Sequence, residues 1–197
     1  MKTKKGFTLL ELLIVIGILA ILSTTMIIVI NPAELLKKAR DSQRISDLST
    51  VKTVIAYYLT VVASPSIGAT ATSYNNVSTS VSCTGFTGAA TSTAQTVDGN
   101  GWIPISFTSI SDGSPIPSLP LDPNPTAYNA TTGRYYVYLV SANTTYELVA
   151  NMESDYYKNG GTSDVESKDG GKISALYEVG TNLALTTSSA NCFGTTP

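Results

Sequence analysis

The chain has 197 residues, a formal net charge of -2 and no histidine. This length corresponds to one domain with room for an additional segment. The charge balance argues against nucleic acid as the main partner, because a phosphate-binding surface needs a large cationic excess. The missing histidine excludes His-based triads and histidine metal sites, and two cysteines cannot form a four-cysteine zinc site.

The most apolar part of the chain runs from Phe7 to Ile30, with Glu11 as its only charged side chain. As a helix it would be ~36 Å long, enough to cross a hydrocarbon core of about 30 Å. Lysines without acidic neighbours precede it, so the positive-inside rule predicts a cytoplasmic N-terminus and an exported remainder. A cleaved secretory signal and a plain signal anchor are the alternatives. The apolar run is too long for the former, and no clear A-x-A site follows it.

Glu11 is the unusual residue of this span. A carboxylate costs roughly 2.5–3.5 kcal/mol near the bilayer centre and less near the interface, and it usually has a partner. No basic side chain lies within helical reach on the apolar side. From the residues alone, the simplest interpretation places Glu11 at the headgroup level.

The string from Gly6 through Phe7, Thr8 and Leu9 to Glu11, with the apolar run behind it, resembles the class III signal of type IV pilins and type II secretion pseudopilins. The resemblance implies a basic leader over residues 1–6, cleavage between Gly6 and Phe7 by a prepilin peptidase, and N-methylation of Phe7. It implies that the helix over residues 7–30 is retained, and that Glu11 meets the N-terminal amine of a neighbouring subunit. The implied partners are other pilin subunits, in a homopolymer, and an inner-membrane assembly platform.

The next residues carry the signature of a helix start. Asn31, Pro32 and Glu34 provide an N-cap residue, a proline at the first helical position and an acid two residues later. Pro32 also deprives the preceding turn of a hydrogen bond, which predicts a kink or local melting there. Gly17 is a second weak point.

An amphipathic stripe follows at spacings of three and four residues: Leu48, Val51, Ile55, Tyr58 and Val62. We expect the charged side chains upstream of Leu48, Arg40, Asp41 and Arg44 among them, on the flanks. The pattern predicts one long helix from Phe7 to about Ala63, whose second half, residues 31–63, packs on a globular domain. A coiled coil is the alternative, but the stripe lasts barely two heptads.

Residues 64–197 form the expected exported, β-rich head. Residues 64–101 are rich in Ser, Thr, Gly and Ala and predict a long irregular connection. Residues 102–107 are a candidate strand, and Pro104 suggests an edge. Residues 134–140 and 145–152 predict the strongest strands, joined by a tight hairpin. One helix on a small antiparallel sheet is an α+β arrangement, which is also what the resemblance to pilins implies.

Residues 121–128 resemble the D-P-W-G-x-P-Y turn of major pseudopilins through Asp122, Pro123, Pro125 and Tyr128, although the Trp and the Gly are absent. This turn favours a pseudopilin of a type II secretion apparatus. The long Ser/Thr-rich connection and the two cysteines favour a pilus subunit instead.

A Gly-rich stretch after the predicted strands collects oxygen ligands: Asp155, Asn159, Asp164, Glu166 and Asp169. Hard oxygen ligands on a flexible loop suit Ca²⁺, although the spacing is not that of an EF-hand. The pseudopilin resemblance implies a calcium loop in a comparable position. A solvated acidic loop is the alternative.

Cys83 and Cys192 lie in the part expected to be exported, where disulfides form. A bond between them would stabilise the fold by up to ~4–5 kcal/mol in the chain-entropy model. Pilins often pin the C-terminal region in this way, and two free thiols are the alternative.

The sequence therefore predicts a structural subunit rather than an enzyme. We expect a single-pass protein of the cytoplasmic membrane that enters a periplasmic or cell-surface filament. A membrane-tethered binding module, which uses the signal only for export, is the alternative. Tyr135, Tyr136 and Tyr138 would then be candidates for a sugar-binding face.

Overall fold

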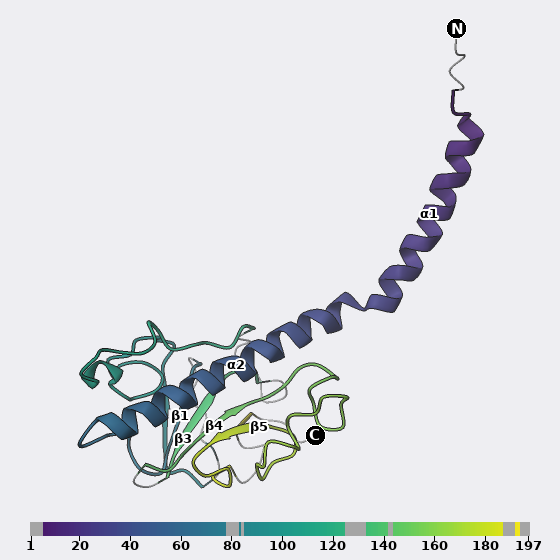
Figure 1. The fold of residues 1–197 in the computed structure, drawn as a ribbon. Helices are drawn as coiled ribbons and strands as arrows, with labels where there is room; N and C mark the ends of the chain where they lie inside the picture. The colour runs from purple at the N-terminus through teal and green to yellow at the C-terminus, as the bar shows by residue number, and fades with distance from the viewer. Residues whose placement is uncertain are drawn as a thin grey trace. The chain divides into compact units, whose positions relative to one another are not determined.

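A computed structural model describes residues 6–77, 83, 85–124, 133–141, 144–186 and 192–193, without the side chains of residues 27–29. The chain divides into two compact units, Met1–Lys37 and Lys38–Pro197. Figure 1 shows the course of the chain, from the N-terminal helix to the β-rich part.

The N-terminal apolar segment forms helix α1, Leu9–Ile30, and the next helix, α2, spans Pro32–Val61. Asn31 separates them in the left-handed conformation, with φ of 43° and ψ of 74°. Proline disfavours the helical conformation in the residue before it, and Asn tolerates the left-handed region. The Glu34 N–H donates to the main-chain oxygen of Asn31 at 3.0 Å and to its Oδ1 at 3.4 Å. The predicted single long helix is therefore wrong, and the break lies where Pro32 predicted a weakness.

The second unit contains a five-stranded sheet in the order β2-β1-β3-β4-β5. Its strands are β1 (Thr72–Asn75), β2 (Gly88–Thr91), β3 (Val137–Val140), β4 (Tyr146–Ala150) and β5 (Tyr177–Gly180). The β1–β2 pair is parallel, and the other neighbours are antiparallel. The expected α+β arrangement is confirmed, with β3 and β4 as the predicted antiparallel pair.

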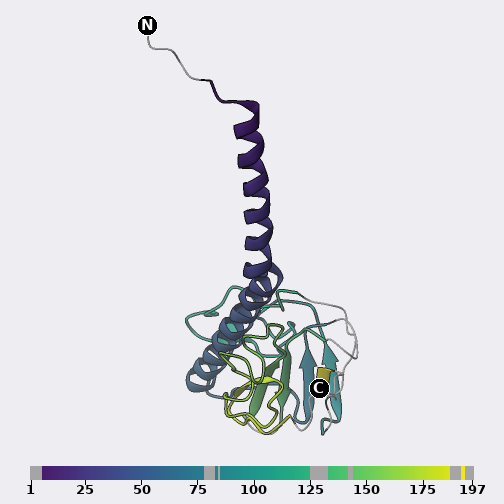
Figure 2. The ribbon, with the colours of Figure 1, turned by 90° about the vertical axis from the view of Figure 1, so that its right-hand side faces the viewer.

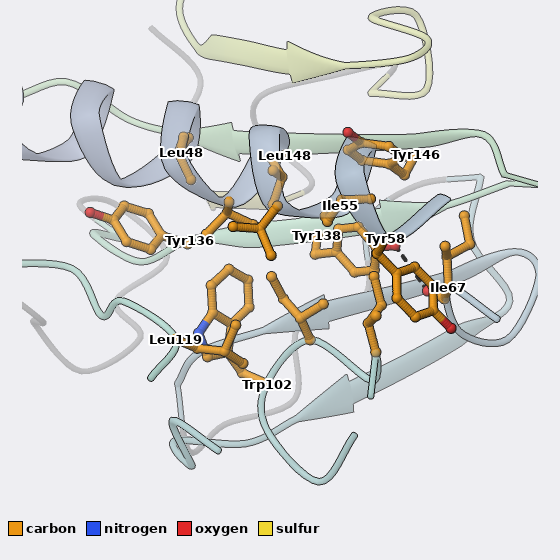
Figure 3. Close-up of a cluster of buried hydrophobic side chains, with 14 of the residues drawn as sticks. Leu48, Ile55, Tyr58, Ile67, Trp102, Leu119, Tyr136, Tyr138, Tyr146 and Leu148 are labelled. Atoms are coloured by element: carbon orange, nitrogen blue, oxygen red, sulfur yellow. Dashed lines mark hydrogen bonds between the residues drawn. The ribbon is translucent and has the colours of Figure 1, made fainter. Parts of the chain in front are cut away.

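Helix α2 lies along one face of this sheet (Figure 2), and the side chains of its apolar stripe pack there (Figure 3). Leu48, Ile55 and Tyr58 are buried there in one cluster with Tyr136, Tyr138, Leu148 and the loop residues Trp102 and Leu119. The Tyr138 hydroxyl donates to the Ile67 carbonyl at 2.9 Å. Because the stripe is already covered by its own head, it does not form the seam of a coiled coil.

The opposite face of the sheet carries a second cluster, which includes Val137, Leu139 and Val149. A disulfide between Cys83 and Cys192 lies in this cluster beside Phe193. The Tyr135 ring stacks on Phe193, and its hydroxyl donates to the Cys192 carbonyl. All residues of β3 and β4 are therefore buried, as expected for strands covered on both faces.

Two expectations about the head are wrong, and one strand was not predicted. Residues 64–101 are not wholly irregular, because they contain β1 and β2, which complete the sheet beside β3. Residues 102–107 form no strand, and a short 3-10 helix, η1, follows at Phe107–Ser109. Trp102, Ile103, Ile105 and Phe107 are all buried around Pro104, so the segment lacks the alternation of an edge strand. Strand β5 was not expected at all.

Candidate functional site

The start of α1 is organised around Thr8 and Glu11. Thr8 is the N-cap residue, and its backbone N–H and hydroxyl donate to Oε2 of Glu11 at 2.9 and 2.7 Å. In return, the Glu11 N–H donates to the Thr8 hydroxyl at 3.3 Å. This is a capping box, which satisfies free amide groups of the first helical turn. This capping box was not predicted, although the T-x-x-E spacing from Thr8 to Glu11 is a sequence signal for it.

The capping box leaves part of the Glu11 carboxylate available. Both bonds from Thr8 fall on Oε2, and no hydrogen bond from a described residue to Oε1 is seen. Phe7 precedes the cap with 78 % of its surface exposed. Glu11 therefore has a role within its own helix and, in addition, an oxygen that a second molecule can reach.

Helix α1 presents apolar side chains in all directions. Its 18-residue window Leu9–Met26 has a mean hydropathy of 2.4 and none of it is buried within the chain. Among the described residues it is the one helix long and apolar enough to cross a membrane. A helix that is apolar all round needs lipid or other protein around it.

Gly6 is not required by the fold of the chain. A Cβ atom placed on it would meet no atom within 4 Å, and its backbone is outside the left-handed region that favours glycine. The structure offers no internal reason for glycine at this position, so any selectivity for glycine must come from another molecule.

The acidic residues proposed as calcium ligands bind the chain's own amide groups instead. Asp164 accepts hydrogen bonds from the N–H groups of Gly160 and Ser167, both at 3.0 Å. Glu166 accepts from the N–H groups of Met152 and Asn159, at 3.1 and 2.9 Å. These bonds hold the loop against the chain that follows β4.

The other two candidate ligands lie apart from this arrangement. Asp169 accepts from the N–H groups of Gly171 and Glu178, and the Asp155 side chain is 82 % exposed, 3.6 Å from Lys158. In the described part of the chain, no three acidic, His or Cys side chains converge. The described geometry therefore shows an acidic loop closed by carboxylate–amide hydrogen bonds, and calcium binding stays a prediction.

A buried ionic network lies between α2 and the chain around Asp122 and Glu153. It was not predicted from the sequence. Arg44 is fully buried and donates two hydrogen bonds of 2.7 Å to Asp122. It also contacts Asp41 at 2.7 Å and Glu153 at 2.6 Å. Glu153 in turn binds Arg40 through two hydrogen bonds of 3.0 and 2.7 Å. Asp41 and Arg44, which we expected on the flanks of the helix, are therefore part of its buried face.

Further contacts satisfy the remaining atoms of this network. Asp41 accepts from the backbone N–H groups of Glu153 and Ser154, and Arg134 lies 3.3 Å from Glu153. Burial alone would raise the pKa of Glu153, but the hydrogen bonds from Arg40 and Arg44 outweigh it and lower the pKa to about 2. Asp122 and Pro123 of the predicted pseudopilin-like turn lie within the described part of the chain, whereas residues 125–128 of that turn lie outside it.

The tyrosines considered for a sugar-binding face are in the protein interior. Tyr135, Tyr136 and Tyr138 are each 0 % exposed. Tyr135 lies in the cluster with the disulfide, while the other two lie beneath α2. The Tyr136 hydroxyl donates to Asp47 at 2.8 Å. These side chains cannot form a binding face on the folded head. The residues suggested for a sugar-binding module are therefore not accessible to a ligand.

Comparison with known proteins gives one match. Residues 1–27 match the model of the prokaryotic N-terminal methylation motif, which is the prepilin-type signal of type IV pilins and pseudopilins. No curated protein and no solved structure matches the chain. The matched segment contains Gly6, Phe7 and Glu11, and it ends within α1.

Proposed function

We propose that this protein is the structural subunit of a type IV pilus-like or pseudopilus filament, cleaved after Gly6 and assembled through α1. The observation that carries the proposal is the apolar helix, unburied within its own chain, in a segment that matches the prepilin-type methylation motif. Such a helix lies in lipid before assembly. In a filament, the same helix of neighbouring copies takes the place of the lipid.

Glu11 gives this assembly a polar contact. Cleavage before Phe7 creates an amine one residue from the capping box, and Oε1 of Glu11 is open to the amine of a second subunit. A buried ion pair is worth little in net stability but is well suited to fix register. The pair would therefore set the stagger of successive subunits along the filament.

The location and partners follow from the same signal. The lysines of the leader hold the N-terminus in the cytoplasm, where a prepilin peptidase acts, and the head lies outside the membrane. An inner-membrane platform then transfers subunits from the bilayer into the filament. The disulfide between Cys83 and Cys192 fits an oxidising compartment for the head. The signal is that of structural proteins, and we propose that this chain is no enzyme.

The experiment that tests this function is recovery of sheared material from cells expressing the chain. We expect filaments that contain the protein with an N-methylated Phe7 at its N-terminus. Gly6→Leu is the matched control, because the fold leaves room for a side chain there while the peptidase would not accept it. Its precursor should stay uncut in the membrane. A correctly processed chain that stays entirely in the membrane fraction would instead indicate a tethered module.

A further inference from the structure

Two glutamates face each other inside the head, on the side of the sheet opposite α2. Glu147 lies in β4 and Glu178 in β5, and both are 0 % exposed. Glu147 pairs with Gly180 and Glu178 with Val149, so the two glutamates are diagonal neighbours on one face. Neither belongs to the acidic loop or to the network of Arg44.

Each glutamate holds a flanking segment of chain against the sheet. Oε2 of Glu147 accepts the Thr186 N–H at 2.7 Å and its hydroxyl at 3.1 Å. Oε2 of Glu178 accepts the Ile173 N–H at 2.8 Å. Gly171 makes this approach possible, because a Cβ atom on it would collide with the Glu178 carboxylate.

The remaining oxygens of the pair have only each other. Oε1 of Glu147 and Oε1 of Glu178 are buried and have no donor among the described residues. The strand register places the two side chains diagonally on one face, and interaction with Glu147 contributes to the raised pKa of Glu178. Two ionised carboxylates in this position would be desolvated, unpaired and mutually repulsive. One shared proton removes the mutual repulsion and pairs the two remaining oxygens, because one carboxyl then donates to the other.

The surroundings favour the protonated pair. The charged group nearby is Asp169, whose carboxylate accepts the Glu178 N–H at 2.6 Å, and β3 places the apolar Leu139 opposite Glu147. No described Lys or Arg forms an ion pair with either glutamate. Burial, followed by the contact with Glu147, raises the pKa of Glu178 to about 9, and burial also raises the pKa of Glu147.

We propose that Glu147 and Glu178 share one proton, and that this shared proton keeps the segments around Ile173 and Thr186 on the sheet. Loss of the proton to alkaline solvent releases both segments. A cation is the less suitable occupant, because two carboxylates alone do not complete the coordination shell of a hard ion. The folded head then takes up one proton that the unfolded chain lacks at neutral pH.

The sign of the pH effect follows from this uptake. The folded pKa lies above the ordinary value of 4.5. The stabilisation is therefore complete below pH 4.5 and declines as the pH rises toward about 9, where the proton is lost. Replacement of Glu178 by Gln keeps an acceptor for Ile173 and a donor toward Glu147, but has no proton to lose.

The test is the melting temperature of the full chain in detergent micelles, measured from pH 5 to pH 10. We expect the parent to lose thermal stability over this range. Glu178→Gln should match the parent at pH 5 and melt at a higher temperature at pH 9. Asp112→Asn, which removes an exposed charge from a turn, is the control and should keep the steep profile of the parent. Equal slopes for the parent and Glu178→Gln would overturn the proposal.

Infrared spectroscopy provides a measurement that needs no variant. The parent at pH 6 should show the carbonyl band of a buried protonated carboxyl group, and this band should disappear at high pH. The band should be missing in Glu178→Gln, or in Glu147→Gln if the first variant does not fold. A parent without any protonated carboxyl band at pH 6 would rule out the shared proton.

Discussion

The guanidinium of Arg44 and the carboxylate of Asp122 face each other through two hydrogen bonds of 2.7 Å, although 78 positions of sequence separate them. Both side chains are buried, so this contact fixes α2 to the chain that leads toward β3. Asp41 and Glu153 bind the same guanidinium and extend the connection to the end of β4. The position of α2 on the sheet thus depends on charge pairing as well as on its apolar stripe.

We predict that Arg44→Met destabilises the head by about 3–5 kcal/mol, because it leaves buried carboxylates without their partner. Chemical denaturation of the full chain in micelles measures this loss. Lys158→Gln is the matched control, since it removes an exposed pair with Asp155 and should change the unfolding free energy little. Strictly additive effects of Arg44→Met and Asp122→Asn in a double-mutant cycle would contradict the coupling.

The acidic loop gives a prediction about calcium. Because Asp164 and Glu166 already accept backbone N–H groups, millimolar Ca²⁺ should leave the melting temperature of the head unchanged. Glu166→Ala should instead increase the hydrogen exchange of the Met152 and Asn159 amides in calcium-free buffer. A clear rise in melting temperature with Ca²⁺, lost in Asp164→Asn, would restore the calcium site suggested by the sequence.

The disulfide gives a prediction about the second face of the sheet. Cys83 and Cys192 are 109 positions apart, and a loop of this length corresponds to about 4–5 kcal/mol in the chain-entropy model. We expect Cys83→Ser/Cys192→Ser to melt at a lower temperature by thermal denaturation. Addition of reductant should lower the melting temperature of the parent but not that of the double variant. Equal melting of the oxidised and reduced parent would show that Tyr135 and Phe193 hold this face without the covalent bond.

The parts of the fold with local signals could be predicted from the sequence. The continuous apolar run of α1, the Asn31-Pro32 pair and the stripe of α2 each have their cause within a few residues. The β-branched and aromatic residues of β3 and β4 gave an equally local signal. The same holds for the segment with Gly6, Phe7 and Glu11, which matches the methylation motif.

The parts of the structure that were not predicted depend on contacts between residues far apart in the sequence. Strands β1 and β2 consist of small and polar residues that gain their conformation by pairing beside β3. Arg44 looked like a flank residue because the carboxylate of Asp122 is far away in the sequence. The pair of Glu147 and Glu178 arises only when β4 and β5 are neighbours. Helical period and strand propensity carry no information about such contacts.

We propose above that subunits assemble through α1 and that the charge of Glu11 sets the register between neighbouring subunits. Glu11→Ala removes both the charge and the capping box, whereas Glu11→Gln can keep the box and removes only the charge. Export, cleavage at Gly6 and the stability of the head should be unchanged in both variants. Glu34→Gln, a charge change at the start of α2, serves as the control.

The most direct measurement is the yield of sheared filaments from cells that express each variant at the level of the parent. The account predicts normal yield for Glu34→Gln and loss of filaments for both Glu11→Ala and Glu11→Gln. Loss in Glu11→Ala alone would assign the role of Glu11 to the capping of α1. Normal filaments from both Glu11 variants would contradict the account, because the apolar helices would then align without the carboxylate.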